Sequence, residues 1–258
     1  MASLAQLIED FNASAEFRPP ADWSQGRTTY GGLSAALALQ AALRDGPDLL
    51  PPLKSAQILF VGPVSGSLRF QARILRQGRS TTSIGVDVLS GPDVALRAAF
   101  IFASPRPTRV HHDFSGPPAV PAPADCLRIP AAGPMPAFLG NFEMRPAGGS
   151  MPVSGSGNPE IVSWVRHADA AGVDPAVALV ALGDALPPAV MSCLTEFAPL
   201  SSMNWTVDLP QPAQEGDWFL LRSSSRQAAG GYSFQVMEVW DEQRRLVLSG
   251  VQTVAVFA

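Results

Sequence analysis

Asp184 is the residue whose type and position most directly indicate chemistry in this chain. It is the only charged residue between Asp174 and Glu196, and it lies near the carboxyl end of an apolar segment typical of a helix. The helix dipole disfavours a negative charge at that end. A buried carboxylate there must therefore be paired, hydrogen-bonded or protonated. The alternative is a solvated aspartate at a fraying helix end, just before Pro187 and Pro188.

Ser202 and Gln252 are polar residues on two predicted strands. Period-two alternation assigns Ser202 to a polar strand face with Asn204, Thr206 and Asp208, opposite the apolar residues Met203, Trp205, Val207 and Leu209. A serine on such a face is usually solvated. Gln252 is the sole long polar residue between 247 and 257. If buried, its amide needs several hydrogen bonds and can orient a water; on an edge strand it would face solvent.

The remaining reactive residue types give weaker signals. Cys193 has no neighbouring base or cation and is predicted to be a buried structural thiol. His111, His112 and Asp113 lack further ligands at useful spacing, so we expect a solvated loop, no metal and no cofactor. Six arginines could meet phosphate groups of a ligand or be ordinary surface charges: Arg76, Arg79, Arg106, Arg109, Arg222 and Arg226.

The composition excludes several classes of protein. Of the 258 residues, 47% are hydrophobic and 16% are charged, with a net charge of -4, which excludes disorder of the whole chain. Two cysteines exclude a disulfide scaffold, and the absence of a basic run argues against a nucleic-acid partner. No apolar stretch is long enough for membrane insertion, and residues 1–17 lack the pattern of a secretory signal. We therefore expect a cytoplasmic protein.

Proline divides the chain into two halves. Nine prolines crowd residues 105–136, and a second loose stretch, 146–159, adds four glycines. Proline lacks an amide donor and fixes φ, so it disfavours central strands and helices. We predict an N-terminal repeat at 1–103, a crossover linker at 104–158 and a C-terminal repeat at 159–258 that carries the candidate site.

The two halves resemble each other. An apolar helix at 31–44 is matched by another at 174–185, where Asp174 and Pro175 are typical of a helix start. Predicted strands follow each helix, at 53–60, 69–75, 81–89 and 95–103 in the first half and at 200–207, 218–222, 232–240 and 246–257 in the second. A helix that is apolar around its circumference must be covered by the sheet of its own half. The fold class is therefore α+β, with two fused helix-wrapped antiparallel sheets.

This pattern resembles the double hotdog fold of the type II acyl-CoA thioesterases. The sequence Tyr30-Gly31-Gly32 resembles the family's aromatic-Gly-Gly entry to the first helix, and Phe60-Val61-Gly62-Pro63 resembles its F-x-x-P pattern. The resemblance implies an acyl-CoA substrate and a catalytic set of an aspartate, a serine or threonine, and a glutamine. Asp184, Ser202 and Gln252 fall at matching places. The chain departs from the family at Asn204 and Trp205, where relatives commonly carry an Asp-His pair.

Hydrolysis by an activated water suits this set of residues. The only histidines, at 111, 112 and 167, lie outside the repeated cores, and no G-x-S-x-G elbow is present, so a covalent serine mechanism is not supported. Asp184 would act as general base while Ser202 and Gln252 hold the water. Tyr30, Gly31 and Gly32 would bind substrate or supply oxyanion donors. The alternatives are a non-catalytic acyl-thioester binding module and a hotdog dehydratase or hydratase. The fused apolar sheets also predict a homo-oligomer.

Overall fold

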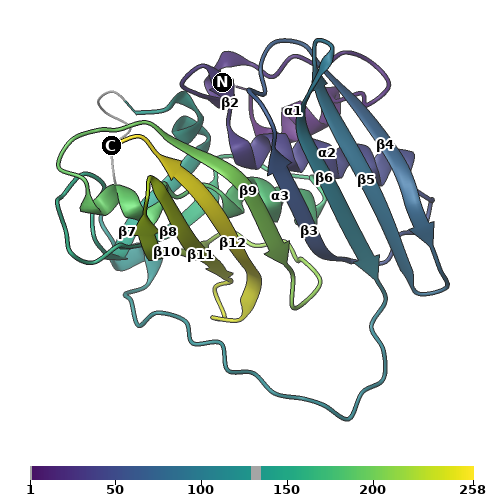
Figure 1. Cartoon of the computed structure of the whole chain (residues 1–258). Helices are drawn as coiled ribbons and strands as arrows, with labels where there is room; N and C mark the ends of the chain where they lie inside the picture. The colour runs from purple at the N-terminus through teal and green to yellow at the C-terminus, as the bar shows by residue number, and fades with distance from the viewer. Residues whose placement is uncertain (1, 129–134) are drawn as a thin grey trace.

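The computed structural model describes residues 2–128 and 135–258. In this part of the chain, ten strands form one antiparallel sheet in the order β4-β5-β6-β3-β9-β12-β11-β10-β8-β7, and the helices lie behind it in Figure 1. The first half supplies β3 (Leu53–Phe60), β4 (Leu68–Gln77), β5 (Thr81–Ser90) and β6 (Asp93–Ala103). The second half supplies β7 (Phe142–Gly149), β8 (Glu160–His167), β9 (Leu200–Asp208), β10 (Phe219–Ala229), β11 (Tyr232–Trp240) and β12 (Leu246–Val256).

Two buried helices pack side by side against the sheet. They are α2 (Gly31–Asp45) and α3 (Pro175–Gly183), and the shorter α1 (Leu4–Asp10) packs into the same core. Asp174 caps α3, because its Oδ1 accepts hydrogen bonds from the amides of Ala176 and Val177. A short hairpin, β1 (Ser24–Gln25) with β2 (Thr28–Thr29), leads into α2, and short 3-10 turns occur at Ala21–Trp23, Pro123–Asp125, Ala137–Asn141 and Ala189–Cys193.

The two helices approach closely where α2 begins and α3 ends. The hydroxyl of Tyr30 donates to the carbonyl oxygen of Ala181 over 2.8 Å. A Cβ atom built on Gly32 would lie 2.6 Å from the same carbonyl oxygen, so any larger residue would force the helices apart. This contact brings the start of the first helix next to Asp184, which follows the last residue of α3.

The predicted double hotdog architecture is confirmed, with one difference in strand order. Within each half the strand that follows the helix pairs with the last strand of that half, so β3 pairs with β6 and β9 with β12. In a simple meander, β3 would pair with β4 and β9 with β10. The two halves join through β3 and β9, where Ile58 faces Trp205. This edge-to-edge pairing leaves no strand edge exposed at the junction.

The predicted linker contains a strand that the proline pattern did not indicate. Residues 142–149 form β7, the last strand of the sheet, which pairs with β8. Pro146 is accommodated because β7 is an edge strand and because the register shifts between Pro146 and Gly148. The three ranges 1–103, 104–158 and 159–258 remain predictions of domain organisation.

Another part of the linker covers the outer face of the second half. Residues 105–114 are exposed and form the long loop below the sheet in Figure 1. The next residues cover a second apolar cluster of Val162, Trp164, Trp218, Leu220 and Trp240. Proline-rich chain offers carbonyl oxygens but few amide donors. Side-chain donors complement it: Trp164 donates to the Pro121 carbonyl over 2.9 Å, and Arg244 donates to those of Pro118 and Val120.

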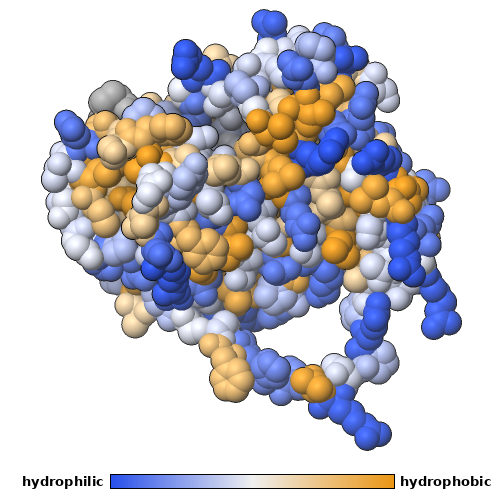
Figure 2. Space-filling view, viewed as in Figure 1, coloured by the Kyte–Doolittle hydropathy of each residue, from blue (hydrophilic) through white to orange (hydrophobic). Residues whose placement is uncertain are grey.

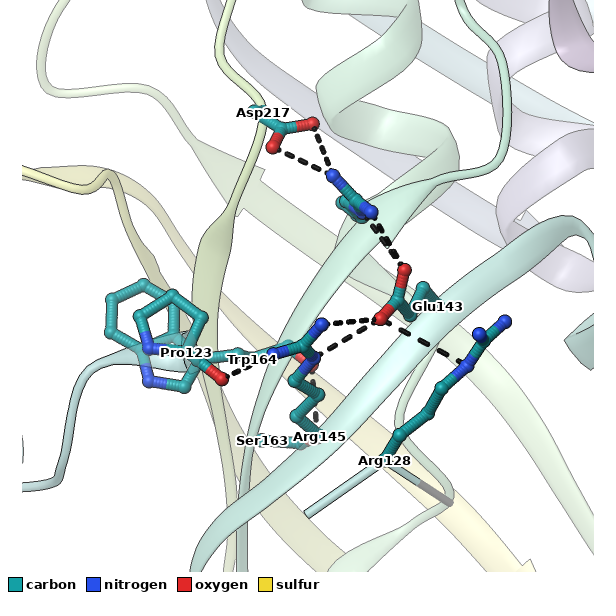
Figure 3. Close-up of polar contacts among 8 residues, drawn as sticks. Pro123, Arg128, Glu143, Arg145, Ser163, Trp164 and Asp217 are labelled. Carbon is teal, nitrogen blue, oxygen red and sulfur yellow. Dashed lines mark hydrogen bonds and ion pairs between the residues drawn. The ribbon is translucent and has the colours of Figure 1, made fainter. Parts of the chain in front are cut away.

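The carboxylate of Glu143 forms ion pairs with arginines beside this part of the linker. Figure 3 shows the Glu143 carboxylate accepting hydrogen bonds from Arg145, whose guanidinium also donates to the Pro123 carbonyl over 2.7 Å. Arg166 donates to Glu143 and to Asp217, each over 2.8 Å. Both guanidiniums lie over the ring of Trp218, so cation–π contact adds to the ion pairs.

The sheet surface away from the helices carries scattered apolar side chains. Figure 2 shows this face as apolar patches separated by polar groups. Exposed apolar residues on the strands include Leu59, Ile74, Leu75, Ile101, Met203, Tyr232 and Phe234. Among the described residues, none of the helices has the length and apolar character needed to cross a membrane.

Candidate active site

Asp184 lies directly after α3, against the start of α2. Its Oδ1 accepts a hydrogen bond of 2.7 Å from Nε2 of Gln252. Its carboxylate also accepts from the backbone amide of Gly32. A Cβ atom on Gly31 would lie 2.7 Å from Oδ2, so the aspartate occupies space that only a glycine leaves open. The side chain is therefore held on three sides and is not at a frayed, solvated helix end.

Burial sets the protonation behaviour of Asp184. It raises the pKa of the carboxyl from 3.8 to about 7, and the hydrogen bonds from Gln252 and the Gly32 amide oppose that rise. No ion pair involving Asp184 is found in the described part of the chain. A carboxyl with these properties releases and accepts a proton near neutral pH, as a general base must.

Gln252 is the centre of the polar network. It lies on β12, is 1% exposed, and faces the helices beside apolar neighbours. While Nε2 donates to Asp184, Oε1 accepts two hydrogen bonds, from Oγ of Ser202 over 3.1 Å and from Nε2 of Gln235 over 3.0 Å. The structure thus brings Asp184, Ser202 and Gln252 together, although they are far apart in the sequence.

The predicted strand face of Ser202 is wrong, and a β-bulge is the reason. Along β9 and β12, Trp205 faces Gln252 and Asn204 faces Thr253, but Val254 faces Ser202. Met203 is therefore an extra residue, and it reverses the alternation for everything before it. Ser202 consequently shares the inner face with Trp205 and lies half-buried beside Gln252.

Gln235 was not identified from the sequence as part of the site. It lies on β11 directly opposite Gln252 in the register and is 1% exposed. A signal was available, because Gln235 shares its strand face with Met237 and Val239 in the alternating pattern of 232–240. An amide on an otherwise apolar inner face must find hydrogen-bond partners.

The residues at the start of α2 are already engaged with the protein. The Tyr30 ring is buried and its hydroxyl is bonded to Ala181, and burial together with the nearby Asp184 charge raises its pKa well above 10. Tyr30 is therefore neutral at physiological pH. The Gly32 amide bonds to Asp184. The Gly32 amide therefore positions the aspartate, Tyr30 links the two helices beside it, and Gly31 lies against its Oδ2.

Other sequence candidates lie apart from this network. Cys193 is exposed, so its predicted burial is wrong: it is the last residue of a 3-10 turn in which Ala189, Val190 and Ser192 are the buried residues. Asp113 accepts hydrogen bonds from Ser115 in the exposed linker beside His111 and His112, and the described residues contain no cluster suited to a metal ion. Arg222 pairs with Glu238, and the other five candidate arginines are exposed.

Sequence comparisons identify the family. The pattern of the acyl-CoA thioesterase C-terminal domain matches residues 123–256, and that of the acyl-CoA thioesterase N-terminal domain matches residues 19–103. The chain belongs to the acyl-CoA thioesterase family. It is a thioester hydrolase by that membership, as the resemblance of its sequence to the type II acyl-CoA thioesterases predicted. A comparison with curated proteins gave no match.

Solved structures share the fold of this family member over nearly its whole length. A conserved protein with a hot dog fold from Alicyclobacillus acidocaldarius is 23% identical, with a TM-score of 0.84 and coverage of 97% of this chain and 98% of that one. The acyl-CoA thioesterase II TesB2 from Mycobacterium marinum is 19% identical, with a TM-score of 0.74 and coverage of 97% and 98%. The tesB protein of Mycobacterium avium subs paratuberculosis is 18% identical, with a TM-score of 0.78 and coverage of 99% and 100%.

Proposed function

We propose that this thioesterase hydrolyses acyl-CoA by a water held between Asp184 and Ser202, with Asp184 as the general base. The observation that carries the proposal is the hydrogen-bond chain from Ser202 through Gln252 to Asp184. Each donor in this chain meets an acceptor, and the chain ends on a carboxylate that no cation neutralises among the described residues. Such a carboxylate is available to take a proton from water.

The role of Gln252 in this proposal differs from the sequence-based expectation. Its Oε1 has two lone pairs, and Ser202 and Gln235 already donate to it. One N–H of Nε2 points to Asp184, so only the second N–H remains for a water. Gln252 therefore serves chiefly to orient Asp184 and Ser202, and these two side chains hold the water.

The reaction follows from these positions. The water oxygen forms a bond to the thioester carbonyl carbon as one of its protons passes to Asp184, which gives a tetrahedral oxyanion. The oxyanion re-forms the carbonyl as the carbon–sulfur bond breaks, and the thiolate of CoA leaves and takes up the proton held by Asp184, which restores the carboxylate and gives the free acid. The backbone amide of Gly31 is the donor proposed for the oxyanion, because the Gly32 amide already binds Asp184.

A covalent serine mechanism does not fit the contacts of Ser202. Its hydroxyl proton points to an amide oxygen, which is not a base of useful strength. The half-buried His167 lies elsewhere, with Nε2 2.9 Å from the carbonyl oxygen of Ala178 and a pKa lowered to about 4 by desolvation of its ring. The hydroxyl of Ser202 is thus a water ligand in the proposal, not a nucleophile.

The test is a thiol-release assay over acyl-CoA substrates of different chain length. Asp184→Asn should lower kcat by about 10²- to 10⁴-fold, the contribution typical of a positioned general base. Gln252→Ala should lower kcat by a similar amount, because it removes the amide that orients both Asp184 and Ser202. Asp208→Asn on the exposed face of β9 is the matched control and should retain activity. Full activity of Asp184→Asn would overturn the proposal. If the wild-type protein binds CoA in calorimetry but hydrolyses none of the acyl-CoA substrates, a non-catalytic binding module is favoured instead.

We also propose that the chain self-associates. The apolar side chains exposed on the sheet, among them Leu59, Ile101 and Phe234, support this assignment. Light scattering of the full chain should give a mass of at least twice the 27.2 kDa of one chain. A monomer at micromolar concentration would contradict it.

A further inference from the structure

Gln235 makes contacts that only one orientation of its amide satisfies. Its Oε1 accepts a hydrogen bond of 3.1 Å from the backbone amide of Ala189, and the Ser223 hydroxyl lies at 3.5 Å from the same oxygen. A backbone N–H can only donate, so the oxygen of Gln235 must face Ala189. Its amino group therefore faces Gln252.

The orientation of Gln252 follows from that of Gln235. The Gln235 amino group can only donate, so it requires the oxygen of Gln252 on its side. The amino group of Gln252 is then directed to Asp184, which as a carboxylate can only accept. Ser202 meets the same Gln252 oxygen and must donate its single hydroxyl proton to it. The direction of every bond in the chain is thus fixed from the backbone of Ala189 onward.

We infer that Gln235 is a positioning residue of the active site, which makes Asp184 and Ser202 present only acceptors to the reacting water. This inference rests on the proposed function. With its hydroxyl proton committed to Gln252, Ser202 offers lone pairs to the water, and Asp184 does the same. A water that donates both protons turns an oxygen lone pair outward, and this is the electron pair that attacks the thioester carbon.

Without Gln235, the orientation of the Gln252 amide should no longer be fixed. With an apolar side chain in its place, Gln252 could rotate its amide and present oxygen to Asp184, which favours the protonated carboxyl. The titratable group that faces Asp184 from α2 is Tyr30, which stays neutral, and no ion pair to Asp184 is found among the described residues of the packed strands. A change in the pKa of Asp184 would therefore report the Gln252 orientation.

The experiment compares Gln235→Leu, Gln235→Glu and the control Ser233→Ala. Ser233 is buried on the same face of β11, and its hydroxyl contacts Ser225 outside the chain of bonds. Gln235→Leu should lower kcat about 10- to 100-fold, the range seen when an outer hydrogen-bond partner of a site residue is removed. Its KM should change little, and the Asp184 pKa, followed by NMR of ¹³C-labelled aspartate carboxyls, should rise above that of wild type. Ser233→Ala should change neither quantity.

Gln235→Glu supplies a rescue that a purely structural role would not show. One carboxyl oxygen can still accept from Ala189, and the other can donate to Gln252 only while protonated. Its activity relative to wild type should therefore fall as the pH rises. Unchanged kcat and Asp184 pKa in Gln235→Leu would overturn the inference. A shifted pKa in an enzyme whose wild type hydrolyses no acyl-CoA would instead leave the positioning role intact and overturn the proposed function.

Discussion

Nε2 of Gln252 lies 2.7 Å from Oδ1 of Asp184 and is the side-chain donor that holds this carboxylate inside the protein. The Gln252 amide and the Gly32 backbone N–H oppose the effect of burial, and the pKa of Asp184 still rises to about 7. The ionised form is therefore reactive because it is only partly stabilised. The pH dependence of catalysis follows directly from this pair.

The value of kcat/KM should increase as the pH rises through about 7. Asp184 must be ionised to accept a proton, and below its raised pKa most molecules carry it protonated. An initial-rate profile between pH 5.5 and 9, with the Asp184→Asn rate subtracted for background hydrolysis, measures the effect. A profile that is flat over this range would show that no such base limits the reaction.

Asp184→Asn should make the fold more stable at alkaline pH. The native pKa of about 7 exceeds the ordinary 3.8, so between these values the native state binds more protons than the unfolded state, and stability falls as the pH rises. This rise corresponds to at most about 4 kcal/mol. Partial solvent contact and the loss of one acceptor reduce the expected gain to about 1–2 kcal/mol at pH 8.

Urea unfolding of wild type and Asp184→Asn at pH 4, 6 and 8 measures this gain. The difference in unfolding free energy should widen with pH, since only the aspartate loses a proton. Asp208→Asn, on the exposed face of β9, is the control and should show no comparable trend. If the stability of Asp184→Asn minus that of wild type is smaller at pH 8 than at pH 4, the pKa assigned to Asp184 is contradicted.

Ser202→Ala should lower kcat by about 10- to 100-fold, whereas Ser202→Thr should stay within about 10-fold of wild type. Alanine removes a water ligand and one of the two donors to Gln252, while threonine keeps a hydroxyl at the same carbon. Kinetics with a saturating acyl-CoA distinguish the two. The neighbouring Ser201→Ala is exposed and should be neutral. Equal activity of the alanine and threonine variants would remove the hydroxyl from the mechanism.

Most of the fold could be predicted from the sequence because its signals are local. The apolar segment at 174–185 and the capping Asp174 gave α3, observed at Pro175–Gly183, and the alternation of 232–240 gave β11 with the same bounds. Asp184 was identified because a lone charge in apolar sequence needs a partner. Gln252 was identified because it is a single amide in an apolar strand.

What could not be predicted depends on contacts between distant residues. The bulge at Met203 is defined by pairing of β9 with β12, so strict alternation assigned Ser202 to the wrong face. Pro146 argued against a strand, yet β7 forms at the sheet edge, where a missing amide is tolerated. Gln235 gained its role only through the register that puts it opposite Gln252.

Gly31→Ala should inactivate the enzyme more than it unfolds it. The added Cβ would lie 2.7 Å from Oδ2 of Asp184 and 3.3 Å from the Phe60 ring, so the carboxylate must move although Gln252 and Gly32 hold it. Alanine restricts the unfolded chain more than glycine does, by about 0.4–1 kcal/mol, and this partly offsets the crowding. We expect a net destabilisation of about 1 kcal/mol.

The loss of kcat in Gly31→Ala should reach at least about 10-fold, because displacement of a reacting group by a fraction of an ångström disturbs its alignment. Gly62→Ala is the matched control, since a Cβ there meets no atom closer than 4.0 Å and the activity should be retained. Thermal unfolding and thiol release measured on the same preparations separate folding from catalysis. If Gly31→Ala keeps wild-type kcat, the position of the Asp184 carboxylate is not critical for hydrolysis.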